Sequence, residues 1–293
     1  NVYLRIGRQT QAFAIMAPQV MLGFYADGGA HLVGLGTGNI HGGSTRDGIR
    51  LYWKFNDMVR MELQALDPDS DPIGTSVVTV QNPVAPGVTI TATEENAIPR
   101  FDLAIPITVG NFVIEPSFTW VQQKFDGVEA TDDDSFDSLA GAIGIKAGFG
   151  PVILGGEFTY GKNLGGANYV GASNWNPIAY DNDADGDADR IEDTTGYAWW
   201  FHIGFKLGPA TIYGIVGNNN TDNDGSPVAN DALEFDINHW MYGISVPISV
   251  AKGFTIRPEF MYYDFDSDAK VGGVNGVDRG DQWFLGVQWM LVF

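Results

Sequence analysis

The segment from 181 to 192 contains a motif whose residue types and spacing match a metal site. It reads DNDADGDADRIE and fits the pattern D-x-[DN]-x-[DN]-G-x5-E, which supplies the hard oxygen ligands that Ca²⁺ prefers. Its flanks are loop and strand rather than helix, and alternating aspartates also match by repetition, so a solvated acidic loop is the alternative. The candidate ligands are Asp181, Asp183, Asp185, the carbonyl of Asp187, and Glu192.

The other polar residues do not form a recognisable catalytic set. The histidines His31, His41, His202 and His239 lack the spacing of metal ligands. His239 and Ser245 are six residues apart on one predicted strand, about 20 Å at strand rise, too far to form a Ser–His pair. The chain has no Cys, which excludes disulfides, thiolate zinc sites and thiol nucleophiles. We therefore expect a protein that is not an enzyme and that requires no cofactor, Ca²⁺ being the one candidate.

Charged residues also recur at alternate positions of otherwise apolar segments, where a strand would place them on one face. Eight are basic and five are acidic, so this face has a net charge of +3. The bases are Arg5, Arg50, Lys54, Arg60, Arg100, Lys146, Lys206 and Arg257, and the acids are Glu62, Asp102, Glu115, Glu157 and Glu259.

The elements that position these residues are β-strands. Apolar and polar residues alternate almost everywhere from residue 45 onward, as in the final segment GDQWFLGVQWMLVF. A period of two is typical of strands with two different faces. The pattern predicts twelve strands, at about 2–8, 46–55, 58–66, 99–109, 112–124, 136–149, 152–162, 195–207, 210–218, 235–249, 254–265 and 281–293.

The connections between these strands alternate between short turns and long loops. Short ones such as Gly110-Asn111 and Gly150-Pro151 have turn chemistry. Such alternation predicts an all-β, antiparallel up-and-down meander with all long loops at one end. Strands of 10–14 residues and aromatics near the strand ends favour a transmembrane barrel over a soluble sandwich. The long loops lie at roughly 67–98, 125–135, 163–194, 219–234 and 266–280.

Composition narrows the class of partner. The chain has 293 residues and a net charge of −20, from 16 basic and 36 acidic residues. Of these acids, 28 lie in the long loops and the strand ends beside them. An acidic protein without clustered Lys and Arg is not expected to bind nucleic acid. No run of about 18 apolar residues is present, which excludes a transmembrane helix.

The final strand, which ends in Phe293, resembles the C-terminal insertion signal of bacterial outer-membrane barrels. The meander, the acidic long loops and the absence of Cys are similar to the trimeric general porins, which are usually 16-stranded diffusion channels. The most specific local piece is the strand YLRIGR at 3–8, with its Gly-Arg end. The resemblance implies a homotrimer in the outer membrane of a Gram-negative bacterium, in contact with membrane lipid and lipopolysaccharide.

In those porins, a strand with a Gly-Arg end precedes the loop that folds into the barrel and narrows it. The resemblance therefore implies one barrel domain, 1–293, in which 9–44 is an inward constriction loop. The alternative is that 11–36 contains one or two more strands. The ionisable residues of the loop are Asp27, His31 and His41. The basic wall cluster facing it would include Arg5, Arg8 and Arg50, with Arg100 nearby.

The same resemblance suggests that about four strands precede this chain in a 16-stranded barrel; the alternative is a complete barrel of 12. Both counts are even, as bacterial barrels require. The sequence thus predicts a porin that admits small hydrophilic solutes and ions by passive diffusion. A solute-specific channel with an aromatic track, and a structural or adhesive barrel without conductance, remain open.

The acidic repeat has a direct test. If 181–192 folds around Ca²⁺, the loop from 164 to 193 should become protease-resistant when Ca²⁺ is added and lose that protection with a chelator. Limited proteolysis followed by mass mapping measures this. Equal cleavage in both conditions would show that the repeat is a solvated acidic loop.

Overall fold

The fold was examined in a computed structural model of the chain, which describes residues 1–10, 12, 45–67, 75–81, 89–94, 98–126, 135–163, 178–180, 190–223, 235–267 and 280–292. These residues form strands and the connections between them, and they include no helix long and apolar enough to cross a membrane.

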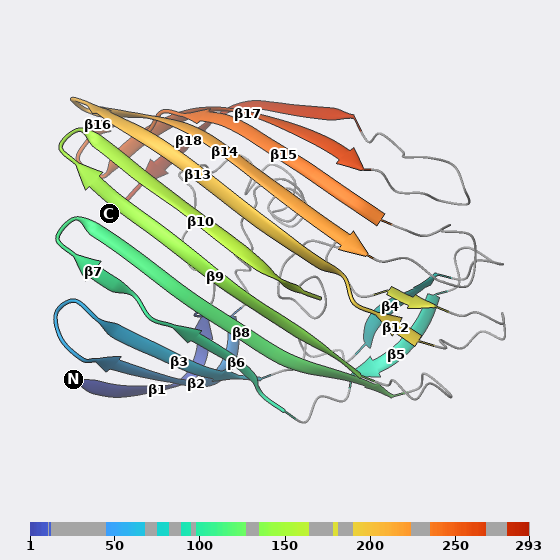
Figure 1. Cartoon of the computed structure of the whole chain (residues 1–293). Helices are drawn as coiled ribbons and strands as arrows, with labels where there is room; N and C mark the ends of the chain where they lie inside the picture. Colours follow the sequence, from blue (N-terminus) through green and yellow to red (C-terminus); the bar gives the residue numbers. More distant parts are fainter. Residues whose placement is uncertain are drawn as a thin grey trace.

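One antiparallel sheet forms a curved wall in which strands pair mostly with their neighbours in sequence (Figure 1). The wall strands of its first half are β1 (Val2–Thr10), β2 (Thr45–Lys54), β3 (Arg60–Leu66), β6 (Arg100–Ala104), β7 (Ile107–Val109), β8 (Phe112–Asp126) and β9 (Ser135–Phe149). Those of its second half are β10 (Val152–Lys162), β13 (Thr195–Leu207), β14 (Ala210–Asn223), β15 (Phe235–Ser245), β16 (Ile248–Ala251), β17 (Phe254–Ser267) and β18 (Asp281–Leu291).

Two of the predicted strands are interrupted by proline, which has no N–H to donate to a ladder. The predicted strand 99–109 divides into β6 and β7 at Pro106, and 235–249 divides into β15 and β16 at Pro247. Both proline carbonyls still accept ladder hydrogen bonds, from Arg60 N at 3.2 Å and from Thr211 N at 3.0 Å. If each pair counts as one wall strand, the described part of the wall has the twelve antiparallel strands that the sequence predicts.

Two of the predicted long loops contain strands that the sequence analysis did not predict. The connection 67–98 contains β4 (Thr75–Gln81) and β5 (Thr89–Glu94), which pair with each other. The connection 163–194 contains β11 (Ile178–Tyr180) and β12 (Arg190–Glu192), also a pair, and β11 lies parallel to β4. The prediction of uninterrupted loops was therefore wrong here, because short β-branched segments such as TSVVTVQ can pair outside the wall.

The short turns lie at one end of the wall, together with Asn1 and the end of β18, and the long connections leave from the other end (Figure 1). Glycine is required at the short turns because Gly150 and Gly208 both have a positive φ, of 58° and 59°. In each turn the next residue is proline, whose ring restricts φ to about −65°. The turn chemistry predicted from the sequence thus closes the hairpins at the short-turn end.

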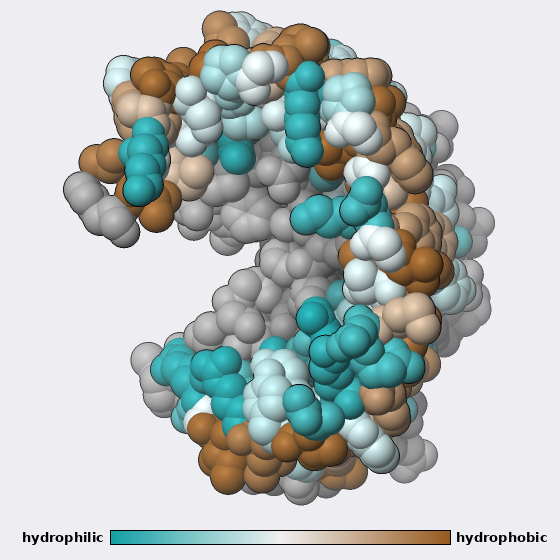
Figure 2. Space-filling view, turned by 90° about the vertical axis from the view of Figure 1, so that its left-hand side faces the viewer, coloured by the Kyte–Doolittle hydropathy of each residue, from teal (hydrophilic) through white to brown (hydrophobic). Residues whose placement is uncertain are grey.

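The two faces of the wall differ in chemistry, and Figure 2 shows hydrophilic residues on the concave face of a C-shaped wall and hydrophobic residues on its convex face. Exposed apolar side chains occupy the convex positions, among them Leu4, Ile49, Phe118, Phe201 and Leu285. On β13, Tyr197 and Leu207 mark the two ends of this apolar band, ten residues apart. Ten residues of a strand tilted by about 40° span roughly 25 Å, the height of the apolar band of membrane barrels.

The ends of the C are β1 and β18. In the described part of the chain, β1 pairs with β2 only, and β18 pairs with β17 only. A complete barrel of twelve strands would require a ladder between β1 and β18, which these residues do not contain. The count of sixteen strands stays a prediction.

The convex face can be tested with a charge substitution. Leu285 is 75% exposed and lies in register with Phe260, which is exposed on the same face. We expect Leu285→Arg to destabilise the barrel by about 2–4 kcal/mol, because a charge near the middle of the apolar band loses its hydration in lipid. Urea unfolding from lipid vesicles measures this.

The matched control is Gln282→Arg on the concave face of the same strand, in register with Tyr263. This variant should fold with nearly unchanged stability. Equal stability of both arginine variants would show that the faces are assigned wrongly.

Candidate functional site

The charged residues predicted for one face of the strands do share a face. The cross-strand register connects Arg5 to Arg50, Gln64, Asp102 and Thr119 in one row over β1, β2, β3, β6 and β8. Alternation along the strands and the remaining pairings place the other predicted wall charges on this same concave face, namely Lys54, Arg60, Glu62, Arg100, Glu115, Lys146, Glu157, Lys206, Arg257 and Glu259.

The first cluster on this face consists of arginines bridged by one carboxylate. Arg50 and Arg60 contact the two oxygens of Glu62, each at 3.3 Å. Arg5 lies directly opposite Arg50 on the adjacent strand, an arrangement of like charges that destabilises a strand pair. Glu62 offsets part of this repulsion, and the cluster retains an excess of positive charge. Such an excess attracts anions to the wall.

A second cluster is fully buried. Arg100 donates to Asp102 through Nε at 2.9 Å, and their exposed fractions are 1% and 0%. The same carboxylate accepts a hydrogen bond from Thr119 Oγ1 at 2.7 Å and one from the backbone N of Ala12 at 3.2 Å. The chain just after β1 therefore approaches the concave face of β6. Residues 13–44, with Asp27, His31 and His41, lie outside the described part, so the inward course of 9–44 stays a prediction.

The second half of the concave face carries fewer charges and more aromatic and thioether side chains. Tyr213, Ile215, Met241, Met261 and Tyr263 form a buried cluster, which Ile153 and Phe284 adjoin. Trp200 and His202 lie next to it, with ring centroids 5.4 Å apart. The aromatic track that the sequence allows consists of Tyr52, Trp200, Tyr213, Tyr263 and Phe284, and all but Tyr52 lie in or beside this cluster. Met241 and Met261, which lie at the polar alternation positions of β15 and β17, were not predicted.

Glycines on neighbouring strands make room for these side chains. A Cβ on Gly155 would lie 2.6 Å from Nε2 of His202, and one on Gly204 would lie 2.5 Å from Cε1 of Tyr213. The two rings therefore occupy the space that side chains at these glycine positions would fill, and their planes are inclined by 75° to each other. Glycine positions on the concave face were the signal by which the sequence could have located this aromatic half.

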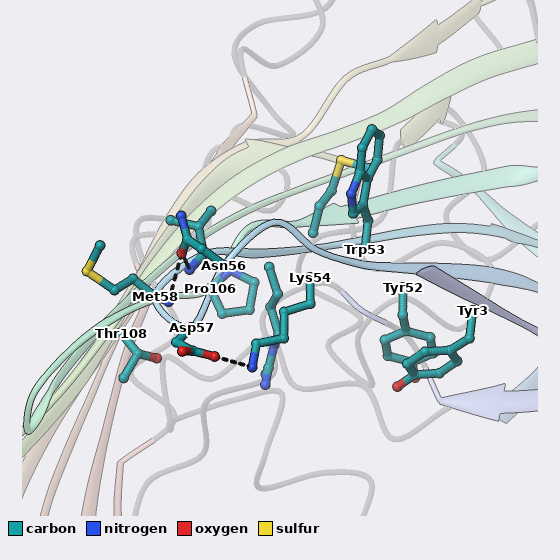
Figure 3. A pocket seen from close by; sticks show the side chains of 12 residues that line it. Tyr3, Tyr52, Trp53, Lys54, Asn56, Asp57, Met58, Pro106 and Thr108 are labelled. Atoms are coloured by element: carbon teal, nitrogen blue, oxygen red, sulfur yellow. Dashed lines mark hydrogen bonds and ion pairs between the residues drawn. The ribbon is translucent and has the colours of Figure 1, made fainter. Parts of the chain in front are cut away.

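A pocket of about 320 Å³ lies at the short-turn end of the wall, and residues of both faces line it, among them Lys54 of the concave face and Trp53 of the convex face (Figure 3). We call it the mouth pocket; the lining residues that matter here are Tyr3, Tyr52, Lys54, Asp57, Arg60 and Thr108. Lys54 donates to Asp57 at 2.6 Å, and this contact lowers the pKa of the Asp57 carboxyl. Asn56 accepts hydrogen bonds from the backbone N of Met58 and Val59, which holds the turn that forms the rim.

Other predicted site residues lie elsewhere. Arg8 is exposed and in register with Asp47, on the alternate side of β1 from Arg5 and Gln9. It therefore does not join the basic row of the concave face. The reason is the strand period, because residues 5 and 8 are an odd number of positions apart.

The calcium candidates Asp181, Asp183, Asp185 and Asp187 lie outside the described residues. The backbone of Glu192 lies in β12, opposite Ile178 in the hairpin β11–β12. The segment thus follows β11 directly, and its last three residues form β12. Ca²⁺ binding at this repeat stays a prediction.

Polar side chains link the two ends of the connection 163–194 at the long-loop end of the wall. Asn163, buried and with a positive φ of 56°, donates to Asp193 Oδ1 at 2.6 Å and accepts from Thr194 N at 2.9 Å. Lys162 contacts the other oxygen of Asp193 at 2.6 Å. These contacts join the ends of β10 and β13 where the long connection begins and ends.

The comparisons with known proteins agree with this architecture. The sequence matches no protein-family model and no curated protein. The outer membrane channel DcaP of Acinetobacter baumannii is 15% identical with a TM-score of 0.67, covering 98% of this chain and 71% of that one. OmpT of Vibrio cholerae is 12% identical with a TM-score of 0.55, covering 99% and 77%. An anion-selective porin from Comamonas acidovorans is 12% identical with a TM-score of 0.53, covering 98% and 72%.

At these identities the likeness concerns the fold. The chain therefore has the all-β fold of outer-membrane β-barrel channels, with polar residues on the concave face and apolar residues outside. The resemblance to porins drawn from the sequence is confirmed at the level of the fold.

The buried cluster provides a test of the wall's electrostatics. Replacing Asp102 by Asn removes the charge that compensates Arg100 and should destabilise the barrel by about 3 kcal/mol, since breaking a buried ion pair leaves an uncompensated charge. Thr119→Val removes one hydrogen bond to the same carboxylate and should cost about 1 kcal/mol. Heat-dependent migration on SDS gels ranks the two variants. Two variants as stable as the parent would show that this cluster does not hold the wall.

Proposed function

We propose that this chain forms the wall of a porin in the outer membrane of a Gram-negative bacterium, through which small hydrophilic solutes and ions diffuse passively. The observation that carries the proposal is the division of the faces: charged residues from β1 through β17 lie on the concave side, and exposed apolar residues lie on the convex side. A polar lumen replaces part of the hydration of a passing ion, and an apolar exterior suits lipid.

The proposal includes the expectations that the resemblance to general porins implies. The protein would assemble as a homotrimer, with lipid and lipopolysaccharide around it, and 9–44 would narrow the lumen. The hydrogen bond from Ala12 N to Asp102 supports the last point, because it brings the start of this segment to the concave face. The buried aromatic half of that face favours a second candidate, a channel specific for one class of solute.

Conductance separates these functions. A diffusion porin should conduct in planar bilayers in proportion to salt concentration, whereas a solute-specific channel should show a current that one solute saturates or blocks. A structural or adhesive barrel should conduct no current, and that result would refute the proposal.

Ion selectivity gives a finer test, because two charge distributions oppose each other. The concave face has eight bases and five acids, whereas the long connections and their flanks carry most of the chain's 36 acids. The Debye length is about 30 Å at 0.01 M salt and about 3 Å at 1 M. The acidic long connections should therefore make the channel prefer cations at low salt. At high salt their charge is screened, and the basic residues of the wall should determine the selectivity.

Reversal potentials under a fixed small gradient, at several mean salt concentrations, measure this shift toward anions. Arg5→Gln is the matched variant: it removes one exposed wall charge and should move the selectivity toward cations mainly at 1 M. A cation preference that grows with salt would contradict the proposed roles of the basic wall and the acidic long connections.

A further inference from the structure

The mouth pocket contains a pair of stacked tyrosines that the diffusion function does not require. The rings of Tyr3 and Tyr52 are 4.5 Å apart and inclined by only 15° (Figure 3). Arg50 donates to the hydroxyl of Tyr52 at 2.9 Å and lies 5.5 Å from the centre of its ring, so Tyr52 is held in place. Tyr3 is 59% exposed. The pair therefore offers an open aromatic face at the rim of the wall.

Two cations stand beside this aromatic face. Lys54 and Arg60 lie directly opposite each other on β2 and β3, and about half of each side chain is exposed. Lys54 pairs with Asp57, whose side chain is 96% exposed; such surface pairs are worth little, so Lys54 can change partner at small cost. Arg60 also contacts Glu62 at 3.3 Å. Among the residues that line the pocket, Lys54 and Arg60 are basic and Asp57 is acidic, so the lining has an excess of positive charge that favours an anion.

We propose that the mouth pocket is a subsite for small organic anions that carry a flat aromatic ring, such as a one-ring carboxylate. The ring stacks on Tyr3, and the carboxylate contacts Lys54 and Arg60, whose guanidinium can bind it through two parallel hydrogen bonds. A volume of about 320 Å³ is at the lower end of ligand pockets and suits one ring with one acidic group. The subsite rests on the proposed function in that it gives the diffusion channel a preferred class of solute at its short-turn end.

Benzoate is the probe, and cyclohexanecarboxylate is its match in charge and size without an aromatic face. In planar bilayers, benzoate added on the short-turn side should interrupt the current at concentrations about threefold to tenfold lower than cyclohexanecarboxylate, the range that aromatic stacking provides. Equal potency of the two anions would overturn the subsite while leaving the diffusion channel intact.

Variants assign the effect to the pocket. Tyr3→Leu, at an exposed position, should abolish the preference for benzoate over cyclohexanecarboxylate. Arg60→Gln should raise the concentration at which either anion interrupts the current. Lys206→Gln is the matched control, because Lys206 is an exposed cation at the same end of β13 outside the pocket. It should lower anion conductance without changing the ratio of the two anions. A preference that persists in Tyr3→Leu would overturn the proposal.

A binding measurement separates the subsite from the channel. Saturation-transfer NMR of benzoate with the protein in detergent micelles needs no current, and its signal should fall in Tyr3→Leu. Binding that depends on Tyr3 in a protein without conductance would support the subsite and refute the diffusion channel. Conductance without such binding would support the diffusion channel and refute the subsite.

Discussion

The cross-strand register is the constraint on which the rest of this structure depends. Side chains alternate with a period of two, so a slip of one residue between two strands would exchange the lumen-side charges with the lipid-side apolar residues. Pairs such as Arg5 with Arg50 and Leu4 with Leu51 show that neighbouring strands present the same chemistry on the same face. The register is also robust to interruption, because Pro106 and Pro247 break a strand while their carbonyls continue the ladder.

The concave face consists of two halves with different physical properties. Strands β1 to β8 carry arginines paired with carboxylates, as at Glu62 and Asp102, whereas β10 to β18 carry aromatic rings and thioethers next to glycine positions. A charged half produces a field across the lumen, and an apolar half lowers the local polarity near it. In a channel of the proposed kind, a solute with a negatively charged end would turn that end toward β1 to β8, because bases outnumber acids there. The stacked tyrosines at the short-turn end continue the aromatic character onto the charged side.

Much of the architecture could be predicted from periodicity and turn chemistry. The strands 152–162 and 195–207 have the predicted bounds, because alternation there is regular and each hairpin closes with Gly-Pro. Prediction failed at β4, β5, β11 and β12, where long-range pairing stabilises short segments that local pattern does not distinguish from loop. Arg8 also differs from the prediction: the resemblance to porins placed it in the basic wall cluster, whereas the period of β1 puts it on the alternate side from Arg5.

The sequence by itself determined the class of fold, the two ends of the wall and the eight bases and five acids of one face, because these follow from a local period of two. Only the tertiary structure decided which of those charges meet. Arg50, Arg60 and Glu62 come together through the register of β2 with β3. Asp102 accepts hydrogen bonds from Thr119 on the paired strand β8 and from the backbone of Ala12, which is 90 positions earlier in the chain. Tyr3 and Tyr52, 49 positions apart in the sequence, stack for the same reason. Their contact depends on the pairing of β1 with β2, and no local pattern encodes that pairing.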